Sequence, residues 1–262
     1  MTAAGAGTFE QAFHDANQAI SRGIEDVQSN FKLLEERLNR ALKFIYIPGV
    51  SEAIIAGFRQ AADLTNDFMD LLQRFLTEPG YPPALFRIGD MWETDVGQKL
   101  SELAAKMAPS ERAAVDSFSG SAARAYERSA EAQRLATQSF MPLSTSVKGQ
   151  LHELAHSQIV FLLAIGAALV TVVVGIVAAA VSAGSVVGAP AAPPIVVAAA
   201  AGAITMLAGA APIIYDAYSQ FEIAINTFKS ELADSEGMPG NQWPKVGESV
   251  INPRRPWQVA TD

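Results

Sequence analysis

The N-terminal part of the chain carries hydrophobic residues at the spacing of an amphipathic helix. From Ile20 onward the gaps between these residues are four, three, four, three, four and four, which approximates the repeat of a coiled-coil seam. The seam consists of Ile20, Ile24, Val27, Phe31, Leu34, Leu38 and Leu42. Thr8 and Gln11 have the spacing of a capping box, so the helix is predicted to begin there.

A second amphipathic helix is predicted after the sequence "IPGVS", with Ser51 as its N-cap. Its apolar face runs from Ile54 to Phe75, and the proline- and glycine-rich sequence "TEPGYPP" ends it. Because a short loop joins the first two helices, we expect them to pack antiparallel.

Further helices are predicted up to the middle of the chain. One begins near Ala84 and is interrupted at Pro109, with a short continuation to about residue 117. Gly120 then permits a turn, and Ser121 is the expected cap of a helix that bends at Pro142. No stretch alternates between polar and apolar residues with a period of two, so the predicted class is all-α.

The strongest pattern is a stretch without any Asp, Glu, Lys or Arg, from Leu154 to Tyr215. It divides into apolar segments 159–183 and 195–215, each longer than the ~20 residues that cross a bilayer as a helix. The joint between them contains Gly188, Pro190, Pro193 and Pro194. We interpret the stretch as a membrane-competent helical hairpin; a hairpin buried in a protein core is the alternative.

The joint itself, residues 184–194, carries no charge, so pushing it through a bilayer has little polar cost. This favours a hairpin that inserts late, after the chain has been soluble. A hairpin that resides permanently in a membrane remains the alternative.

These patterns predict an elongated antiparallel helical bundle in four parts. Residues 1–80 form an N-terminal helical hairpin, residues 81–157 a second helical hairpin, and residues 158–216 the hydrophobic hairpin. Residues 217–262 are expected to form a short helix and a flexible tail, in which Trp243 and Trp257 could anchor.

The formal net charge is −8, from 27 acidic and 19 basic residues, which argues against nucleic-acid binding. The chain has no cysteine and therefore no disulfide or thiolate metal site. Its first residues lack a basic segment followed by an apolar one, so no cleavable signal peptide is expected. Export would need another route.

The segment from about Pro82 to His156 resembles the WXG-type helical-hairpin family of type VII secretion substrates. The family's W-x-G turn is matched by Phe118-Ser119-Gly120, with Phe in place of Trp, and the sequence "SAARAY" follows and ends at Tyr126. The family's export signal, Tyr-x-x-x-Asp/Glu, has the same spacing as Tyr218 and Glu222, although these residues lie beyond the hydrophobic hairpin. The resemblance implies export by a type VII machine and action at an envelope or target membrane, and it supplies no enzymatic residue.

The sequence "HELAH" gives a competing interpretation. On a helix, His152 and His156 share one face and can bind zinc, with Glu153 as general base. Some membrane-associated zinc metallopeptidases, which this order of segments resembles in part, place a Glu ligand after a transmembrane hairpin; Glu222 has that place here. Its surroundings, "EIAIN", lack the Ala and Asp of that family. The interpretation we favour is that the two histidines mark the amphipathic end of a helix just above the bilayer.

The favoured function is therefore a secreted or envelope-associated type VII substrate without enzymatic activity or cofactor. Its expected partners are membrane lipid, and either the secretion machinery or another helical chain, including a second copy. The alternatives are a helical pore-forming protein and a zinc metallopeptidase. In the favoured mechanism, the helical bundle shields residues 159–215 until a partner, low pH or lipid releases them.

Overall fold

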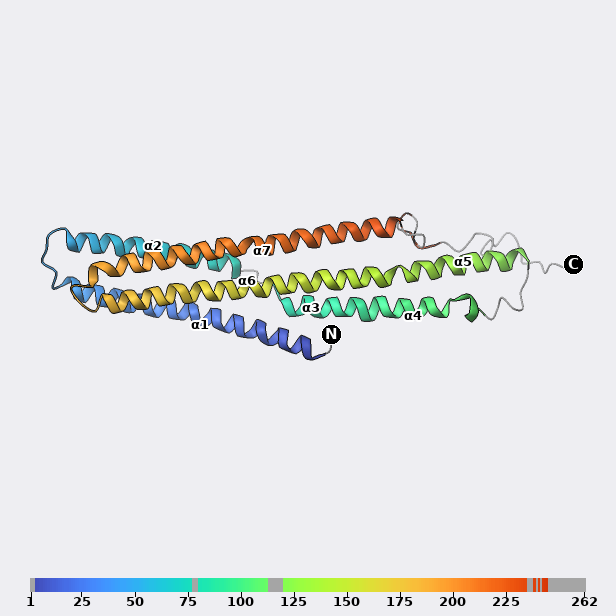
Figure 1. The fold of residues 1–262 in the computed structure, drawn as a ribbon, viewed down its shortest axis with the longest axis horizontal. Coiled ribbons are helices and arrows are strands. Elements are labelled where there is room, and N and C mark those ends of the chain that lie inside the picture. The colour runs from blue at the N-terminus through green and yellow to red at the C-terminus, as the bar shows by residue number, and fades with distance from the viewer. Residues whose placement is uncertain are drawn as a thin grey trace. The chain divides into compact units, whose positions relative to one another are not determined.

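The computed structural model describes residues 3–76, 80–112, 120–234, 238, 240 and 242–244. Every regular element in these residues is helical, which confirms the predicted all-α class (Figure 1). Trp257 and Phe118 lie outside the described residues, as do the predicted continuation near residue 117 and most of the tail.

The first two helices are α1 (Ala3–Leu42) and α2 (Val50–Leu76). Both predicted start signals were wrong by a few residues. Thr8 lies inside α1, and Ser51 lies inside α2, where its hydroxyl donates to the carbonyl oxygen of Ile45 at 3.4 Å. The turn between the helices uses Gly49 at φ 82°, a conformation that favours glycine.

The predicted third helix is divided. It consists of α3 (Pro82–Met91), a π-helix (Trp92–Gln98) and α4 (Lys99–Lys106), followed by a 3₁₀ turn (Pro109–Glu111). The next helix, α5 (Ser121–Gln138), begins directly after Gly120. Gly120 takes the cap position at φ 94°, so the predicted glycine turn is confirmed, whereas the predicted cap at Ser121 is wrong because Ser121 is already the first helical residue.

The hydrophobic hairpin is formed by α6 (Phe140–Ser182) and α7 (Ala192–Asp234), and both helices extend far beyond it. The sequence HELAH lies on α6, the same helix as the first apolar segment. The connection is shorter than predicted, because Pro193 and Pro194 lie in the first turn of α7, where the missing proline N–H is not needed. The predicted separate helix after residue 217 is wrong, since α7 continues to Asp234.

The chain divides into two compact units. The first contains residues 1–83 and 154–217, which are α1, α2 and the apolar parts of α6 and α7. Its largest fully buried side chains come from all four helices: Leu34, Phe68, Leu72, Ile165, Leu169, Val172, Ile176, Pro193, Val196 and Leu207. The seam of α1 therefore points into this unit.

The second unit contains residues 84–153 and 218–262. The contact of α4 with α5 forms part of it. Its fully or nearly buried side chains include Phe86, Ala104, Ala136, Thr137, Leu143 and Ser144. Gly97 in the π-helix approaches Ser144 so closely that a Cβ there would lie 2.9 Å from the serine Cβ.

Candidate functional site

Among the described residues, two helices are long and apolar enough to cross a membrane, and both belong to the hydrophobic hairpin. In the most apolar window of each, 50% of the residues are buried in α6 and 22% in α7. Other helices of the protein thus cover one side of the hairpin and leave another side exposed.

The covered side of α6 packs on α1 and α2 at short range. A Cβ on Gly23 of α1 would lie 3.0 Å from Leu169 Cβ, and the ring of Phe75 in α2 meets that of Phe161 edge-on at 4.9 Å. Near the end of α6, Arg37 donates a hydrogen bond from Nη1 to the carbonyl oxygen of Ala180 at 2.9 Å. Apart from this bond, the contacts named here are apolar and lack directional hydrogen bonds.

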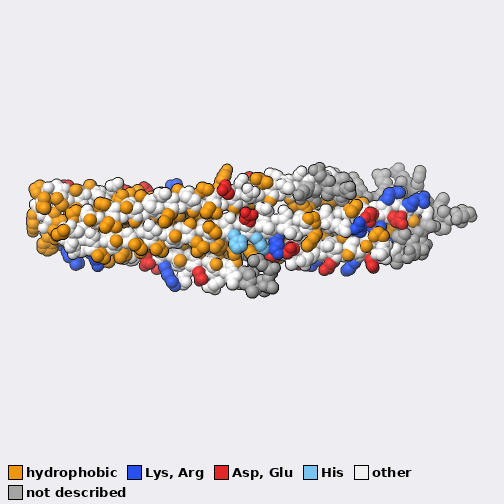
Figure 2. Space-filling view, viewed as in Figure 1, with side chains coloured by type: hydrophobic (Ala, Val, Ile, Leu, Met, Phe, Trp, Pro, Cys, Tyr) orange, Lys and Arg blue, Asp and Glu red, His pale blue; other side chains and the backbone are white. Residues whose placement is uncertain are grey.

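The open side of α6 is a stripe of exposed apolar residues whose gaps are three and four in strict alternation. We call these residues the α6 stripe: Val160, Leu163, Ala167, Val170, Val174, Val177 and Val181. Figure 2 shows hydrophobic side chains gathered over this part of the surface, with charged groups along its edge. At about 1.5 Å per residue, a helix of this length approaches the ~30 Å thickness of a hydrocarbon core.

One row of exposed residues on α7 follows the same spacing, and most of its side chains are small. The row consists of Pro194, Ala198, Ala201, Thr205, Ala208, Pro212 and Tyr215, and the larger Met206 and Ile213 are exposed beside it. Small side chains allow another helix to approach closely, so the two open stripes offer different surfaces to lipid or protein.

The predicted hairpin tip has one buried and one exposed proline at the start of α7. Pro193 is buried against α2, where a Cβ on Gly57 would lie 3.0 Å from Pro193 Cβ, whereas Pro190 and Pro194 are exposed. The carbonyl oxygen of Gly188 accepts a hydrogen bond from the Ser182 hydroxyl at 2.9 Å. This bond and the one that the Gly188 N–H donates to the Ser185 hydroxyl close the turn at the tip.

The side chains of HELAH lie in separate surroundings. His152 stacks on Phe86, with ring centroids 3.8 Å apart, and its Nε2 lies 3.0 Å from the Phe86 carbonyl oxygen and 3.3 Å from Asp90 Oδ1. His156 meets the ring of Phe9 edge-on at 5.2 Å, and Glu153 is exposed. Both neighbours of His152 Nε2 are acceptors, so the geometry favours the tautomer with hydrogen on this nitrogen, in the position that a metal ion would need.

Among the described residues, no group of three or more His, Cys, Asp or Glu side chains is arranged to hold a metal ion. His152, His156 and Glu222, the predicted alternative ligands, form no such group. Glu222 is an exposed residue of α7.

Sequence reasoning missed a polar cluster that surrounds His152. Lys148, one helical turn earlier, lies 2.6 Å from Glu93 Oε2 and 3.1 Å from Asp90 Oδ1. Its side chain is 19% exposed, and the hydrogen bond to Glu93 is the main reason that the pKa of Lys148 is raised. Asp90 and Glu93 precede Lys148 by more than fifty residues in the sequence, so a local sequence pattern could not reveal the cluster.

The residues of the WXG-like pattern and of the export signal lie on or directly beside helices. Gly120 caps α5, and Tyr126 is a partly exposed residue of that helix. Tyr218 and Glu222, one turn apart on α7, are both exposed. Nothing in the described residues covers these two side chains, so they are open to a partner.

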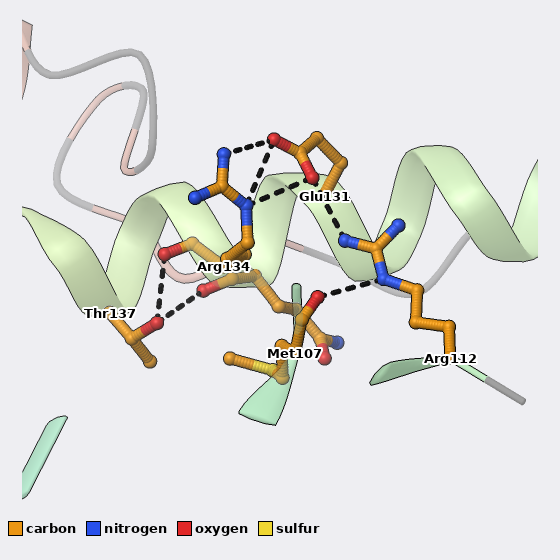
Figure 3. A network of polar contacts seen from close by, with 6 residues as sticks. Met107, Arg112, Glu131, Arg134 and Thr137 are labelled. Carbon is orange, nitrogen blue, oxygen red and sulfur yellow. Dashed lines mark hydrogen bonds and ion pairs between the residues drawn. The ribbon is translucent and has the colours of Figure 1, made fainter. Parts of the chain in front are cut away.

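A network of charged residues lies beside the end of α4 and on α5 (Figure 3). Both Arg134 and Arg112 donate hydrogen bonds to the carboxylate of Glu131, and the bond from Arg112 measures 2.8 Å. Arg112 Nε also donates to the Met107 carbonyl oxygen at 2.8 Å. The hydrogen bonds from Arg134 and then Arg112 lower the pKa of Glu131 to about 2. These bonds tie the chain after α4 to α5.

The second unit also contains an apolar cavity of about 390 Å³. It is lined by side chains of α3, the π-helix, α6 and α7, among them Trp92, Leu151, Phe221 and Phe228, with Lys229 at its edge. Sequence reasoning missed it, because the lining residues come from four separate elements.

Comparison with known proteins leaves the family open: no family model, no curated protein and no solved structure matches the chain.

Proposed function

We propose that this chain is a non-enzymatic helical protein that acts at an envelope or target membrane by inserting the hydrophobic hairpin of α6 and α7. In this proposal the chain is an antiparallel helical bundle, exported as a type VII substrate. The observation that carries the proposal is the two-sided hairpin. It has no charged residue from Leu154 to Tyr215, α1 and α2 cover one side, and the α6 stripe is open on another.

The proposed mechanism is the exchange of one apolar surrounding for another. Release of α1 and α2 would uncover Leu169 and Phe161, and lipid would then replace the contacts that Gly23 and Phe75 make with them. Because those contacts are apolar, little hydrogen bonding is lost when lipid takes their place. The bond from Arg37 to Ala180 is the polar contact that must break.

A reversible lock tests whether the helices must part. The chain has no cysteine, so Gly23→Cys with Leu169→Cys gives a single engineered pair. The Cβ positions are 3.0 Å apart, so a disulfide requires the helices to separate by about 0.5 Å. We expect the oxidised double variant to lose carbonate-resistant association with vesicles and to regain it after reduction.

The controls for this lock are the two single-cysteine variants, which should insert under both conditions. Insertion of the oxidised double variant at the wild-type level would show that α1 need not leave α6. Failure of the wild-type chain to enter any vesicle would reject the proposed function.

Export is tested in the native host. The support for this part of the proposal is the WXG-like pattern around Gly120 and Tyr126 and the exposed pair Tyr218 and Glu222. We expect the chain to disappear from the culture filtrate when the type VII secretion ATPase is deleted. Retention in the membrane fraction of both strains would reject export and leave membrane action to be explained separately.

A pore is a second candidate, favoured by the regular spacing of the α6 stripe. Residues at alternating gaps of three and four allow neighbouring helices to pack side by side. Several inserted hairpins could therefore form a ring. Release of an encapsulated dye from vesicles distinguishes a pore from an anchor, which binds the same vesicles without leakage.

A further inference from the structure

The tip of the first unit is formed by two turns that are distant in the sequence. The turn between α1 and α2 and the turn between α6 and α7 lie at the same end, and the 3₁₀ turn Ala189–Ala191 contacts both α1 and α2 (Figure 1). Between the turns is a hollow of about 530 Å³. Its walls are Arg37, Arg40, Ala41, Phe44 and residues 183–186.

Large apolar side chains protrude from both turns. Phe44, Tyr46 and Ile47 are 62%, 85% and 65% exposed in the first, and Val187 is 93% exposed in the second. The buried residues of the unit lie along the helices, so these four side chains add little to its core. Tyr and Phe beside aliphatic residues suit the boundary between lipid headgroups and acyl chains.

The same end is basic, although the chain as a whole is acidic. Residues 37–51 contain Arg37, Arg40 and Lys43 and no acidic residue, Glu36 and Glu52 lie at the two borders of this range, and residues 154–215 contain no charge at all. Arg37 is held in place by its bond to Ala180, beside the hollow. Neither Arg40 nor Lys43 has an ion-pair partner among the described residues.

We propose that this tip docks on anionic membrane lipid, with a phosphate headgroup in the hollow and Phe44, Tyr46, Ile47 and Val187 in the upper acyl layer. The inference rests on the proposed membrane function, and it adds the class of lipid and the order of events. Docking comes first, and it brings the uncharged turn of the hairpin against the bilayer before insertion.

Charge complementarity selects lipid as the occupant and sets the orientation. A net charge of −8 repels most of the chain from an anionic surface, whereas the three cations attract this end. An approach by this end of the first unit combines that attraction with burial of the four protruding side chains. Reversible membrane docking requires two weak interactions together, here the attraction of basic side chains to anionic headgroups and the burial of apolar side chains among the acyl chains.

The test uses the full chain and vesicles of phosphatidylcholine with or without phosphatidylglycerol. The variant Arg40→Glu with Lys43→Glu reverses two tip charges. The matched control, Arg22→Glu with Lys32→Glu, makes the same change in net charge at exposed positions of α1 that lie away from the tip. We expect the tip variant to lose at least about tenfold in partition to anionic vesicles, and the control to stay within about twofold of wild type.

Two further experiments separate the apolar contribution to vesicle binding from recognition of the phosphate group. Val187→Ser with Tyr46→Ser should weaken binding to both kinds of vesicle, because it removes apolar contacts. Soluble glycerol phosphate should neither bind measurably nor compete at millimolar concentration. Saturable binding of glycerol phosphate in the absence of vesicles would overturn the lipid assignment in favour of a free phosphate compound.

A polarity-sensitive dye on Val174→Cys, in the α6 stripe, reports insertion independently of docking. Equal vesicle binding by the tip variant and its control, with the dye entering the bilayer in both, rejects the docking site and leaves the proposed function standing. If only the tip variant loses vesicle binding, and the dye on the protein with the unchanged tip remains in water, docking is supported and insertion is rejected.

Discussion

Gly175 of α6 lies directly against Ala199 of α7, so closely that a Cβ on the glycine would overlap the alanine methyl group. Ordinary van der Waals contact between the two helices is possible here only because position 175 has no side chain. Gly166, on the same helix, has no neighbouring atom within 4 Å of its Cβ position.

This contrast predicts opposite tolerance at the two glycines. Gly175→Leu should force α6 and α7 apart and lower the free energy of unfolding by roughly 2–4 kcal/mol, since overpacking and backbone movement add. Gly166→Leu should be within about 1 kcal/mol of wild type or more stable. Urea unfolding of both variants, followed by circular dichroism, measures the difference. Equal effects would contradict the close approach.

The Lys148 cluster should contribute more stability than an exposed ion pair. Lys148→Met leaves Asp90 and Glu93 without their cation and should cost about 1–2 kcal/mol. Lys99→Met, which breaks the pair with Asp95 where the lysine is 66% exposed, should cost under about 0.5 kcal/mol. Thermal unfolding of the two variants under the same conditions makes the comparison.

The same cluster has a predictable response to alkali. The pKa of Lys148 is raised in the folded chain, so its stabilising effect is complete below the ordinary value of 10.5 and is lost as the pH rises above it. The difference in midpoint between wild type and Lys148→Met should therefore be constant near neutral pH and shrink above pH 10.5. A difference that grew with alkali would have the wrong sign.

Glu131 should respond at the acidic end. Its pKa is lowered from 4.5 to about 2, so the stability that it contributes is present above pH 4.5 and is lost as the pH falls toward 2. Since the side chain is 37% exposed, we expect a contribution under about 1 kcal/mol. Wild type should lose more stability than Glu131→Gln across that window, as measured by urea midpoints. Parallel curves would contradict the network.

Two glycine-to-alanine variants should differ in sign. Gly120 has φ 94° and ψ −163°, a region nearly exclusive to glycine, so Gly120→Ala should destabilise by about 1–3 kcal/mol even though the space for a Cβ is open. Gly149 is an exposed helical residue with open space, and Gly149→Ala should stabilise by up to about 1 kcal/mol. Differential scanning calorimetry resolves both shifts.

Much of the helical fold could be predicted from local patterns. The repeat from Ile20 to Leu42 predicted α1, and those side chains are buried or half-buried. The absence of charge from residue 154 to 215 predicted the hairpin, and Gly120 predicted the turn before α5. Each of these signals lies within one stretch of sequence, where spacing and composition act directly on the backbone.

The rest depended on contacts between distant residues. The π-helix at Trp92–Gln98 shifts the backbone hydrogen bonds by one residue, and that shift leaves no periodic signature. The surroundings of His152 come from Phe86 and Asp90, more than sixty residues earlier. The basic tip was overlooked because Arg37, Arg40 and Lys43 read as the solvated face of an ordinary helix until the second turn is placed beside them.

The uncharged hairpin has a consequence for detecting the protein. Trypsin cuts after lysine and arginine, and no such residue occurs between Lys148 and Lys229. The whole apolar part of α6 and α7 therefore leaves a tryptic digest as one long, poorly soluble peptide that standard peptide mass spectrometry would miss. A protease that cuts at aromatic or aliphatic side chains, such as Leu163, divides this region into shorter peptides once the chain is denatured.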